Sequence, residues 1–190
     1  MTPIQNTHTL KLISDVGKLK RVQRTGWVRD GVKDAESVAD HSYGVTFLAM
    51  TLAKKLKCNE LKMIKMALVH DLGEAIVGDI VHGRGKKPND KIRNNKINAE
   101  EKALKNMLLK TNYKEYYSLW QEYEKQTTKE AIILKQIDKI EMAMQAYEYE
   151  KETGLNLQEY FDYTQIHLTH PELIKIFEEI VKQRAKAKKN

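Results

Sequence analysis

Apolar side chains recur at intervals of three or four residues along most of the chain, which is the spacing of one face of an α-helix. This pattern predicts helices over residues 9–20, about 38–57, 60 to about 72, 98–110, 113–125, about 130–153, and from 171 onward. No segment alternates apolar and polar residues in the manner of a half-buried strand. The pattern therefore predicts an all-α protein built as a helical bundle.

Residues suited to helix ends support these boundaries. They are Ser37 and Asn59 as N-caps, Thr127 with Glu130 as a capping box, Gly154 as a C-cap, and Pro171 in the first turn of the last helix. Two segments lack the helical pattern and are predicted as loops: residues 24–27, and a basic stretch that extends to about residue 96.

The length and composition indicate one domain. A chain of 190 residues has the size of a single domain, and no repeat or linker-like stretch divides it. We expect one domain over residues 1–190, with its core at about 8–181 and a basic tail at 182–190. The single cysteine, Cys58, excludes a disulfide framework and a Cys-based zinc site. No apolar run is long enough to cross a membrane, and the N-terminal segment lacks the apolar centre of a signal peptide. We therefore expect a soluble protein without membrane contact, located in the cytoplasm, with the nucleus left open as an alternative.

The net charge of +7 arises in three local segments. Residues 1–33 and 84–96 each carry a net charge of +5, and the last ten residues carry five basic and no acidic side chains. The rest of the chain is acidic, with a net charge of −8. A terminal basic run is usually a solvated helix end, so nucleic-acid binding is disfavoured. A non-catalytic, basic nucleic-acid-binding module stays an alternative.

Four ionisable residues occupy positions in the predicted apolar stripes. His41 shares the stripe of the first long helix, His70 and Asp71 end that of the second, and Asp138 interrupts that of a third. A buried carboxylate is costly unless it is paired, hydrogen-bonded or bound to a cation. Two imidazoles and two carboxylates on three helices can converge in a bundle. Without a thiolate, such a set suits a divalent ion of Mn, Fe, Co, Zn or Ni.

Each of these residues also has a structural explanation when it is taken alone. A histidine on an apolar face is most often a satisfied core residue, and a His-Asp pair occurs by chance in many proteins. Asp138 on its own is explained equally by pairing with a lysine. The order of the four is more restrictive, because about 30 residues separate His41 from His70-Asp71 and about 65 separate that pair from Asp138.

Several longer strings resemble the HD-domain superfamily of metal-dependent phosphohydrolases and, within it, the eukaryotic HD-domain-containing protein 2 family. They include Arg24-Thr25-Gly26-Trp27-Val28, Glu36-Ser37-Val38, Ala67-Leu68-Val69-His70-Asp71, Ile76-Val77-Gly78-Asp79-Ile80 and Lys135-Gln136-Ile137-Asp138. The resemblance extends from about residue 10 to 180, and the bacterial relative of this family is the YfbR-type 5′-deoxynucleotidase. The resemblance implies an all-helical fold, a homodimer, and removal of phosphate from deoxyribonucleoside 5′-monophosphates.

The resemblance also implies two groups of metal ligands. A principal divalent ion is expected at His41, His70, Asp71 and Asp138. A second cation is associated with Glu74, Asp79 and the backbone carbonyl of Ile80. The ions we expect are Mn, Co or Mg, with Zn, Fe or Ni as alternatives.

Two further residues match substrate-binding positions of the family. Arg24 matches the position that holds the substrate phosphate. Trp27 matches a tryptophan that discriminates against a ribose 2′-hydroxyl, although two residues separate it from Arg24 here and the bacterial enzymes have the pair adjacent. We expect Glu74 to move a proton or orient water, with Asp79 as the second candidate. If Glu74 instead binds the second cation, it does less proton transfer.

Another substrate for the same fold is the main alternative. An HD-type phosphodiesterase acting on cyclic nucleotides, or a hydrolase of nucleoside polyphosphates, would use the same metal site. Two of the basic segments, which include Arg24 and residues 84–96, would flank that site. There they would raise the local concentration of an anionic small molecule.

Overall fold

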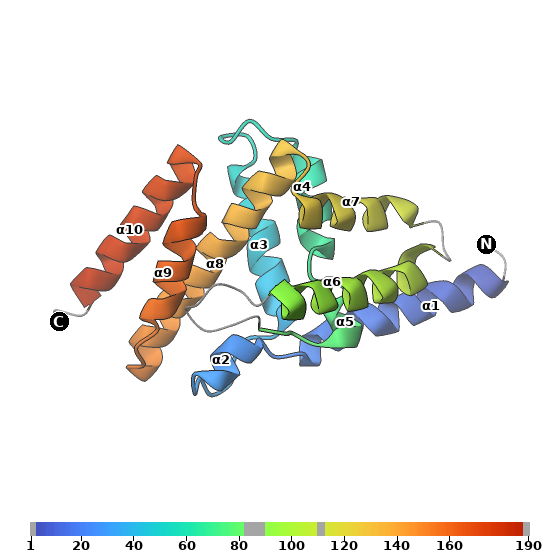
Figure 1. Cartoon of the computed structure of the whole chain (residues 1–190), viewed down its shortest axis with the longest axis horizontal. Helices are drawn as coiled ribbons and strands as arrows, with labels where there is room; N and C mark the ends of the chain where they lie inside the picture. The colour runs from blue at the N-terminus through green and yellow to red at the C-terminus, as the bar shows by residue number, and fades with distance from the viewer. Residues whose placement is uncertain (1–2, 82–89, 110–112, 188–190) are drawn as a thin grey trace.

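The computed structural model describes residues 3–81, 90–109 and 113–187, which form helices joined by short connections (Figure 1). The helices are α1 (Pro3–Lys18), η1 (Leu19–Arg21), α2 (Thr25–Arg29), α3 (Val38–Leu52), α4 (Glu60–Val69), α5 (Glu74–Val77), α6 (Asp90–Leu104), η2 (Lys105–Leu109), α7 (Lys114–Lys125), α8 (Lys129–Thr153), α9 (Gln158–His167) and α10 (Pro171–Ala187). Within those ranges there is no strand, and Gln23 and Ser37 form an isolated β-bridge. The all-α prediction is confirmed.

Four of the predicted helix ends are confirmed. Ser37 is the N-cap of α3 and forms a capping box with Asp40. Asn59 is the N-cap of α4, where its side chain accepts a hydrogen bond from a backbone N–H of the first turn. Gly154 closes α8 in the left-handed conformation, with φ of 71°, and Pro171 is the first residue of α10. Local sequence preference is sufficient at these positions.

The predicted capping box at Thr127 and Glu130 is wrong. Thr128 is the N-cap of α8, and its side chain accepts a hydrogen bond from the backbone N–H of Ala131. The carboxylate of Glu130 is engaged elsewhere, because it accepts a hydrogen bond of 3.1 Å from the backbone N–H of Asn59. A tertiary contact of Glu130 with the start of α4 therefore replaces the reciprocal bond that a capping box would have made.

Both predicted loops contain helix. Residues 25–29 form α2 because Trp27, in its middle, is buried against Tyr149 and Tyr160. The basic stretch is helical from Asp90 onward, and its residues 82–89 lie outside the described part of the chain. α6 is mostly polar, but it buries Glu100, Ala103 and Leu104 at its C-terminal end. Aromatic residues of α8 and α9 thus order the first segment, and packing of α6 against α5 and η2 orders the second.

α8 is the central helix of the bundle. It packs against α3, α4, α7, α9 and α10, and Figure 1 shows it between α3 on one side and α9 and α10 on the other. Because neighbours surround it, α8 buries apolar side chains on several faces, among them Leu134, Ile137 and Ile140. The ionisable residues Asp138 and Glu141 are buried among them.

α10 continues through the boundary predicted at residue 181. Arg184, which was expected in a solvated tail, is buried, and its guanidinium donates to the Glu150 carboxylate of α8 at 2.5 and 2.7 Å. The same guanidinium lies over the ring of Phe161 in α9. This part of the basic tail therefore fixes α10 to the bundle.

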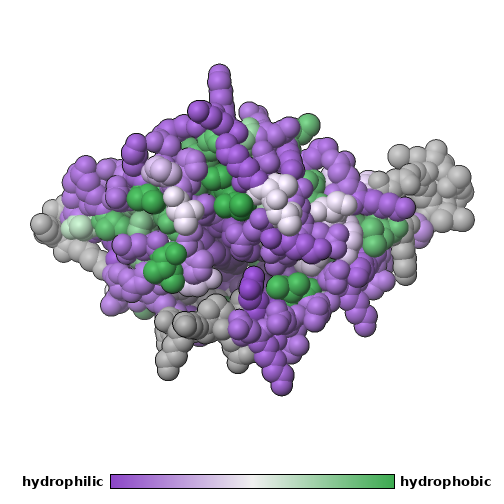
Figure 2. Space-filling view, turned by 45° about the horizontal axis from the view of Figure 1, so that its top comes forward, coloured by the Kyte–Doolittle hydropathy of each residue, from purple (hydrophilic) through white to green (hydrophobic). Residues whose placement is uncertain are grey.

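The face of the molecule shown in Figure 2 is mostly hydrophilic. On the face shown in Figure 2, hydrophobic residues form separate patches within a polar surround. Among the described residues, no helix combines the length and the apolar character needed to cross a bilayer.

Candidate metal centre and active site

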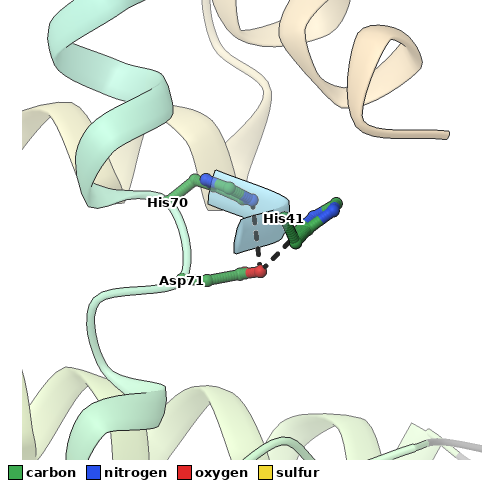
Figure 3. A group of neighbouring side chains, drawn as sticks. All are labelled: His41, His70 and Asp71. Atoms are coloured by element: carbon green, nitrogen blue, oxygen red, sulfur yellow. Dashed lines mark ion pairs between the residues drawn. The ribbon is translucent and has the colours of Figure 1, made fainter. Parts of the chain in front are cut away.

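Three parts of the bundle bring the four predicted metal ligands together. His41 lies in α3, His70 and Asp71 directly follow α4, and Asp138 lies in α8. Asp71 Oδ2 is 3.2 Å from His70 Nε2 and 3.8 Å from His41 Nε2, and Figure 3 shows this carboxylate pointing toward both rings. Asp138 Oδ1 is 3.3 Å from His41 Nε2. Ligand atoms of the two histidines and Asp71 all lie within 4.8 Å of one another, as a shared metal ion requires.

Each imidazole is held through its Nδ1 atom. His41 Nδ1 donates to Glu141 Oε2 at 2.6 Å, and His70 Nδ1 donates to the backbone carbonyl of Ala67 at 2.6 Å. In the described part of the chain, both Nε2 atoms are buried without a hydrogen-bond partner. A buried nitrogen without a partner is unfavourable, whereas a central divalent ion would accept a lone pair from each ring. The residues present therefore fit a metal ion.

Asp138 is oriented through its other carboxylate oxygen. Tyr123 Oη donates to Asp138 Oδ2 at 2.9 Å, and Lys139 Nζ donates to the same oxygen at 3.0 Å. Burial raises the pKa of Asp138. The Lys139 charge and the two imidazoles lower this pKa by a larger amount, so that it lies well below its ordinary value. The result is an ionised carboxylate with Oδ1 directed to the cluster.

The charges of the site influence one another. Burial and the Arg24 charge lower the pKa of His41, but Glu141 and Asp138 raise it by more, to about 10. Burial raises the pKa of Asp71, whereas the two neighbouring histidines bring it far below its ordinary value. Without a metal, the carboxylates are therefore balanced by a protonated imidazole, and metal binding would release that proton.

The start of α2 places Arg24 beside the cluster. Arg24 Nη1 lies 3.6 Å from Asp71 Oδ2. The next residue, Thr25, donates its backbone N–H to Asp79 Oδ2 and its hydroxyl to the Asp79 carbonyl, both at 2.7 Å. These bonds tie the segment after α5 to the start of α2, so that Arg24 and Asp79 both line the site.

Glu74 begins α5 and is almost completely buried. Lys96 of α6 donates to Glu74 Oε1 at 2.6 Å and lies 3.4 Å from Glu100 Oε1. Glu74 Oε2 is buried and has no hydrogen-bond partner among the described residues. Burial and the Asp71 charge raise the pKa of Glu74 well above its ordinary value, and Lys96 offsets part of this effect.

Trp27 lies in the wall of the site, but its surface is only 1% exposed. It stacks on Tyr160 with 4.1 Å between ring centroids and meets Tyr149 edge-on. Its Nε1 donates to Glu36 Oε1 at 2.8 Å. Trp27 therefore packs α2 against α8 and α9. Because these contacts cover its ring, little of the ring surface is left for direct contact with a sugar.

The cluster opens into a cavity of about 790 Å³, which is a size suited to a small-molecule ligand. Charged and polar groups line it near the cluster: Arg24, Asp71, Glu74, Asp79, Lys96, Asp138 and Lys139. Ile80, Trp27, Met142, Tyr160 and Tyr163 contribute apolar and aromatic wall. The cavity thus joins a charged end, suited to a phosphate and a cation, to a wall suited to a nucleoside.

Four side chains that shape the site escaped the sequence analysis: Tyr123, Lys139, Glu141 and Lys96. Glu141 could have been found, because it is three residues after Asp138 and is a carboxylate among apolar positions of the same helix. Lys96 carried no such signal, since it is one of several basic residues in a polar segment.

Comparison with known proteins agrees with the resemblance to HD-domain proteins seen in the sequence. Residues 16–181 match the HD domain. The sequence is 43% identical over 178 residues to the 5′-deoxynucleotidase HDDC2 of Dictyostelium discoideum, an alignment that covers 85% of this chain and 90% of that protein. It is 40% identical over 182 residues to the 5′-deoxynucleotidase HDDC2 of Homo sapiens, with 93% and 86% covered. A solved structure of a conserved hypothetical protein from Pyrococcus furiosus is similar with a TM-score of 0.74 and 40% identity, covering 91% of this chain and 99% of that one.

Proposed function

This chain belongs to the HD domain family, and on that premise we propose that it is a metal-dependent phosphohydrolase that releases phosphate from deoxyribonucleoside 5′-monophosphates. The observation that carries the proposal is that the Nε2 atoms of His41 and His70 are buried, face the Asp71 carboxylate, and have no hydrogen-bond partner among the described residues. Relatives named 5′-deoxynucleotidase, which align over most of their length, support the substrate.

The four residues that would hold the ion are His41, His70, Asp71 and Asp138. The family resemblance implies Mn, Co or Mg, and the mixed set of imidazoles and carboxylates also suits Zn, Fe or Ni. When bound, a divalent ion supplies a more acidic water and offsets phosphate charge. The protein's own contribution is to hold the ligand atoms in place, through Glu141 and Ala67 behind the imidazoles.

Arg24 would bind the substrate phosphate. Its guanidinium lines the cavity beside Asp71, and their separation of 3.6 Å is longer than a hydrogen bond. N–H donors therefore stay available, and a guanidinium can bind two phosphate oxygens at once. The aromatic wall next to Arg24, with Trp27 behind Tyr160, would lie against the nucleoside.

Glu74 would orient the attacking water or accept its proton, because one of its oxygens is held by Lys96 and the other has no hydrogen-bond partner in the part of the chain that the structure describes. Asp79 is the second candidate, although Thr25 already donates to one of its oxygens. Alternatively, Glu74, Asp79 and the Ile80 carbonyl would hold a second cation. Comparing the Glu74→Gln and Asp79→Asn variants at saturating metal separates the two candidates, since the proton-transfer group should lower kcat most.

The substrate is tested by phosphate release from a panel of nucleotides in the presence of Mn, Co or Mg. We expect deoxyribonucleoside 5′-monophosphates to react fastest, ahead of ribonucleoside 5′-monophosphates. Preference for cyclic nucleotides would contradict this proposal and indicate a phosphodiesterase. Preference for triphosphates would contradict it in favour of a polyphosphate hydrolase.

The family resemblance also supports further properties of the protein. We propose that residues 1–190 form one HD domain, that the protein is a homodimer, and that it is cytoplasmic. Light scattering tests the dimer: twice the chain mass of 22.1 kDa is expected, and a single chain mass would contradict it.

A further inference from the structure

One largely buried cation of the site, Lys96, has been described so far only as a contact of Glu74. Lys96 lies in α6, which packs against α5, and its side chain reaches the cavity wall. The approach of α6 is close: a Cβ atom on Gly73 would lie 2.8 Å from Glu100 Cβ and 3.2 Å from Glu100 Cα. Glycine at position 73 therefore lets α6 lie directly over the residue that precedes Glu74.

Lys96 contacts Glu74, the residue proposed above to orient the attacking water or accept its proton. Its ammonium is 2.6 Å from Glu74 Oε1 and 3.4 Å from Glu100 Oε1, and its side chain is 15% exposed. Glu100 is one helical turn further along α6 and forms a second ion pair with the ammonium. Glu74 Oε2 is left without a hydrogen-bond partner in the described part of the chain. The lysine thus takes one oxygen of Glu74 and leaves the second one available.

We propose that Lys96 is a positioning residue for phosphate removal, which holds Glu74 by one oxygen so that the other stays directed at the reacting water. This inference rests on the function proposed above for Glu74. Asp71 carries a negative charge near Glu74, and two like charges in a low-dielectric site repel. The ammonium of Lys96 opposes that repulsion and keeps the Glu74 carboxylate beside the metal ligands.

Stabilisation of the contact between α5 and α6 explains the Lys96–Glu74 ion pair less well than a positioning role does. Burying an ion pair costs desolvation energy that often cancels its attraction, so apolar residues would hold α6 on α5 at least as well. An alternative functional role is direct contact between Lys96 and the substrate phosphate. Kinetics distinguish the two roles, because holding Glu74 affects the chemical step whereas phosphate contact affects substrate binding.

The test compares Lys96→Met with Lys96→Arg, and uses Lys102→Met as a matched control on the exposed face of the same helix. Steady-state kinetics are measured on a deoxyribonucleoside 5′-monophosphate at saturating metal. We expect Lys96→Met to lower kcat by about 10–100-fold with KM changed by less than about threefold, as for other partners that orient site residues. Lys96→Arg should recover a large part of kcat, and Lys102→Met should match the wild type.

A double-mutant cycle with Glu74→Gln tests the connection between the two residues. If Lys96 acts through the Glu74 carboxylate, adding Lys96→Met to Glu74→Gln should lower kcat by less than about threefold. This comparison also covers the case in which Lys96→Met alone does not fold, because Glu74→Gln removes the charge that would be left buried. Thermal unfolding of every variant identifies the folded ones.

The outcomes separate this inference from the proposed function. Wild-type kcat in a folded Lys96→Met variant overturns the inference, as does full additivity in the cycle. A raised KM with unchanged kcat also overturns it, in favour of phosphate contact. If the wild type itself releases no phosphate from any deoxyribonucleotide, the proposed function fails and the inference fails with it.

Discussion

Glu141 holds His41 from the side opposite the candidate metal position, and Glu141→Gln tests how much this contact matters. Glutamine keeps the size of the side chain and an acceptor oxygen but removes the negative charge. The bond it alters is 2.6 Å long and joins a fully buried ring to a carboxylate that is 11% exposed. Such charge-assisted hydrogen bonds are the stronger class, and losing a partner behind a metal ligand typically costs about 10–100-fold in metal affinity. We therefore expect Glu141→Gln to weaken metal binding by about 1.4–2.7 kcal/mol.

The assay is calorimetric titration of chelator-treated protein with Mn, carried out on the wild type, Glu141→Gln and a control. Glu148→Gln is a suitable control, because Glu148 is in the same helix and pairs with Lys151 at the surface. We expect the control to bind metal like the wild type. Equal affinities for Glu141→Gln and the wild type would refute the idea that this hydrogen bond prepares His41 for the metal.

Three other predictions follow from the contacts around the site and the core. Gly44→Ala would place a Cβ atom 2.6 Å from Glu141 Oε1, so the carboxylate that holds His41 must shift. The same titration should show weaker metal binding, and an unchanged affinity would contradict this prediction. Arg184→Met removes the guanidinium from the buried Glu150 carboxylate and should lower the unfolding free energy, measured in urea, by about 3–5 kcal/mol. Lys182→Met, at the surface, should lower it little. Similar losses for both variants would contradict the role of Arg184. Burial raises the pKa of Glu100 from 4.5 to about 7, so the folded protein retains a proton that the unfolded chain releases. The contribution of Glu100 to stability is present below pH 4.5 and is lost as the pH rises through about 7. In the wild type, the unfolding free energy should therefore fall by at most about 3 kcal/mol over this pH range, and Glu100→Gln should lack this fall. Identical pH profiles for wild type and variant would contradict this.

The metal cluster could be found from the sequence because burial of charge is costly. His41 and Asp138 stand at positions whose helical neighbours are apolar, and this conflict is visible without coordinates. The structure brings both residues within 3.3 Å of each other. The caps at Ser37 and Asn59 were predictable for a related reason, since each depends on residues within one turn.

The features that escaped prediction depend on contacts between distant segments. α9 buries only Phe161 and Thr164, which is too few positions for a periodic signal. α2 is ordered by aromatic residues that lie more than 100 positions further along the chain, such as Tyr149. Lys96 gains its role from the meeting of α6 with α5, which its polar neighbours in the sequence do not indicate.

Metal content and phosphate release, measured together on the same samples, test the central claim most directly. We expect the purified protein to contain a bound divalent ion, to lose phosphate release from deoxyribonucleoside 5′-monophosphates when a chelator removes that ion, and to regain it when Mn, Co or Mg is restored. Asp71→Ala should lose both the ion and the activity while keeping the helical circular dichroism of the wild type. Undiminished phosphate release from chelated, metal-free protein would contradict a metal centre at His41, His70, Asp71 and Asp138.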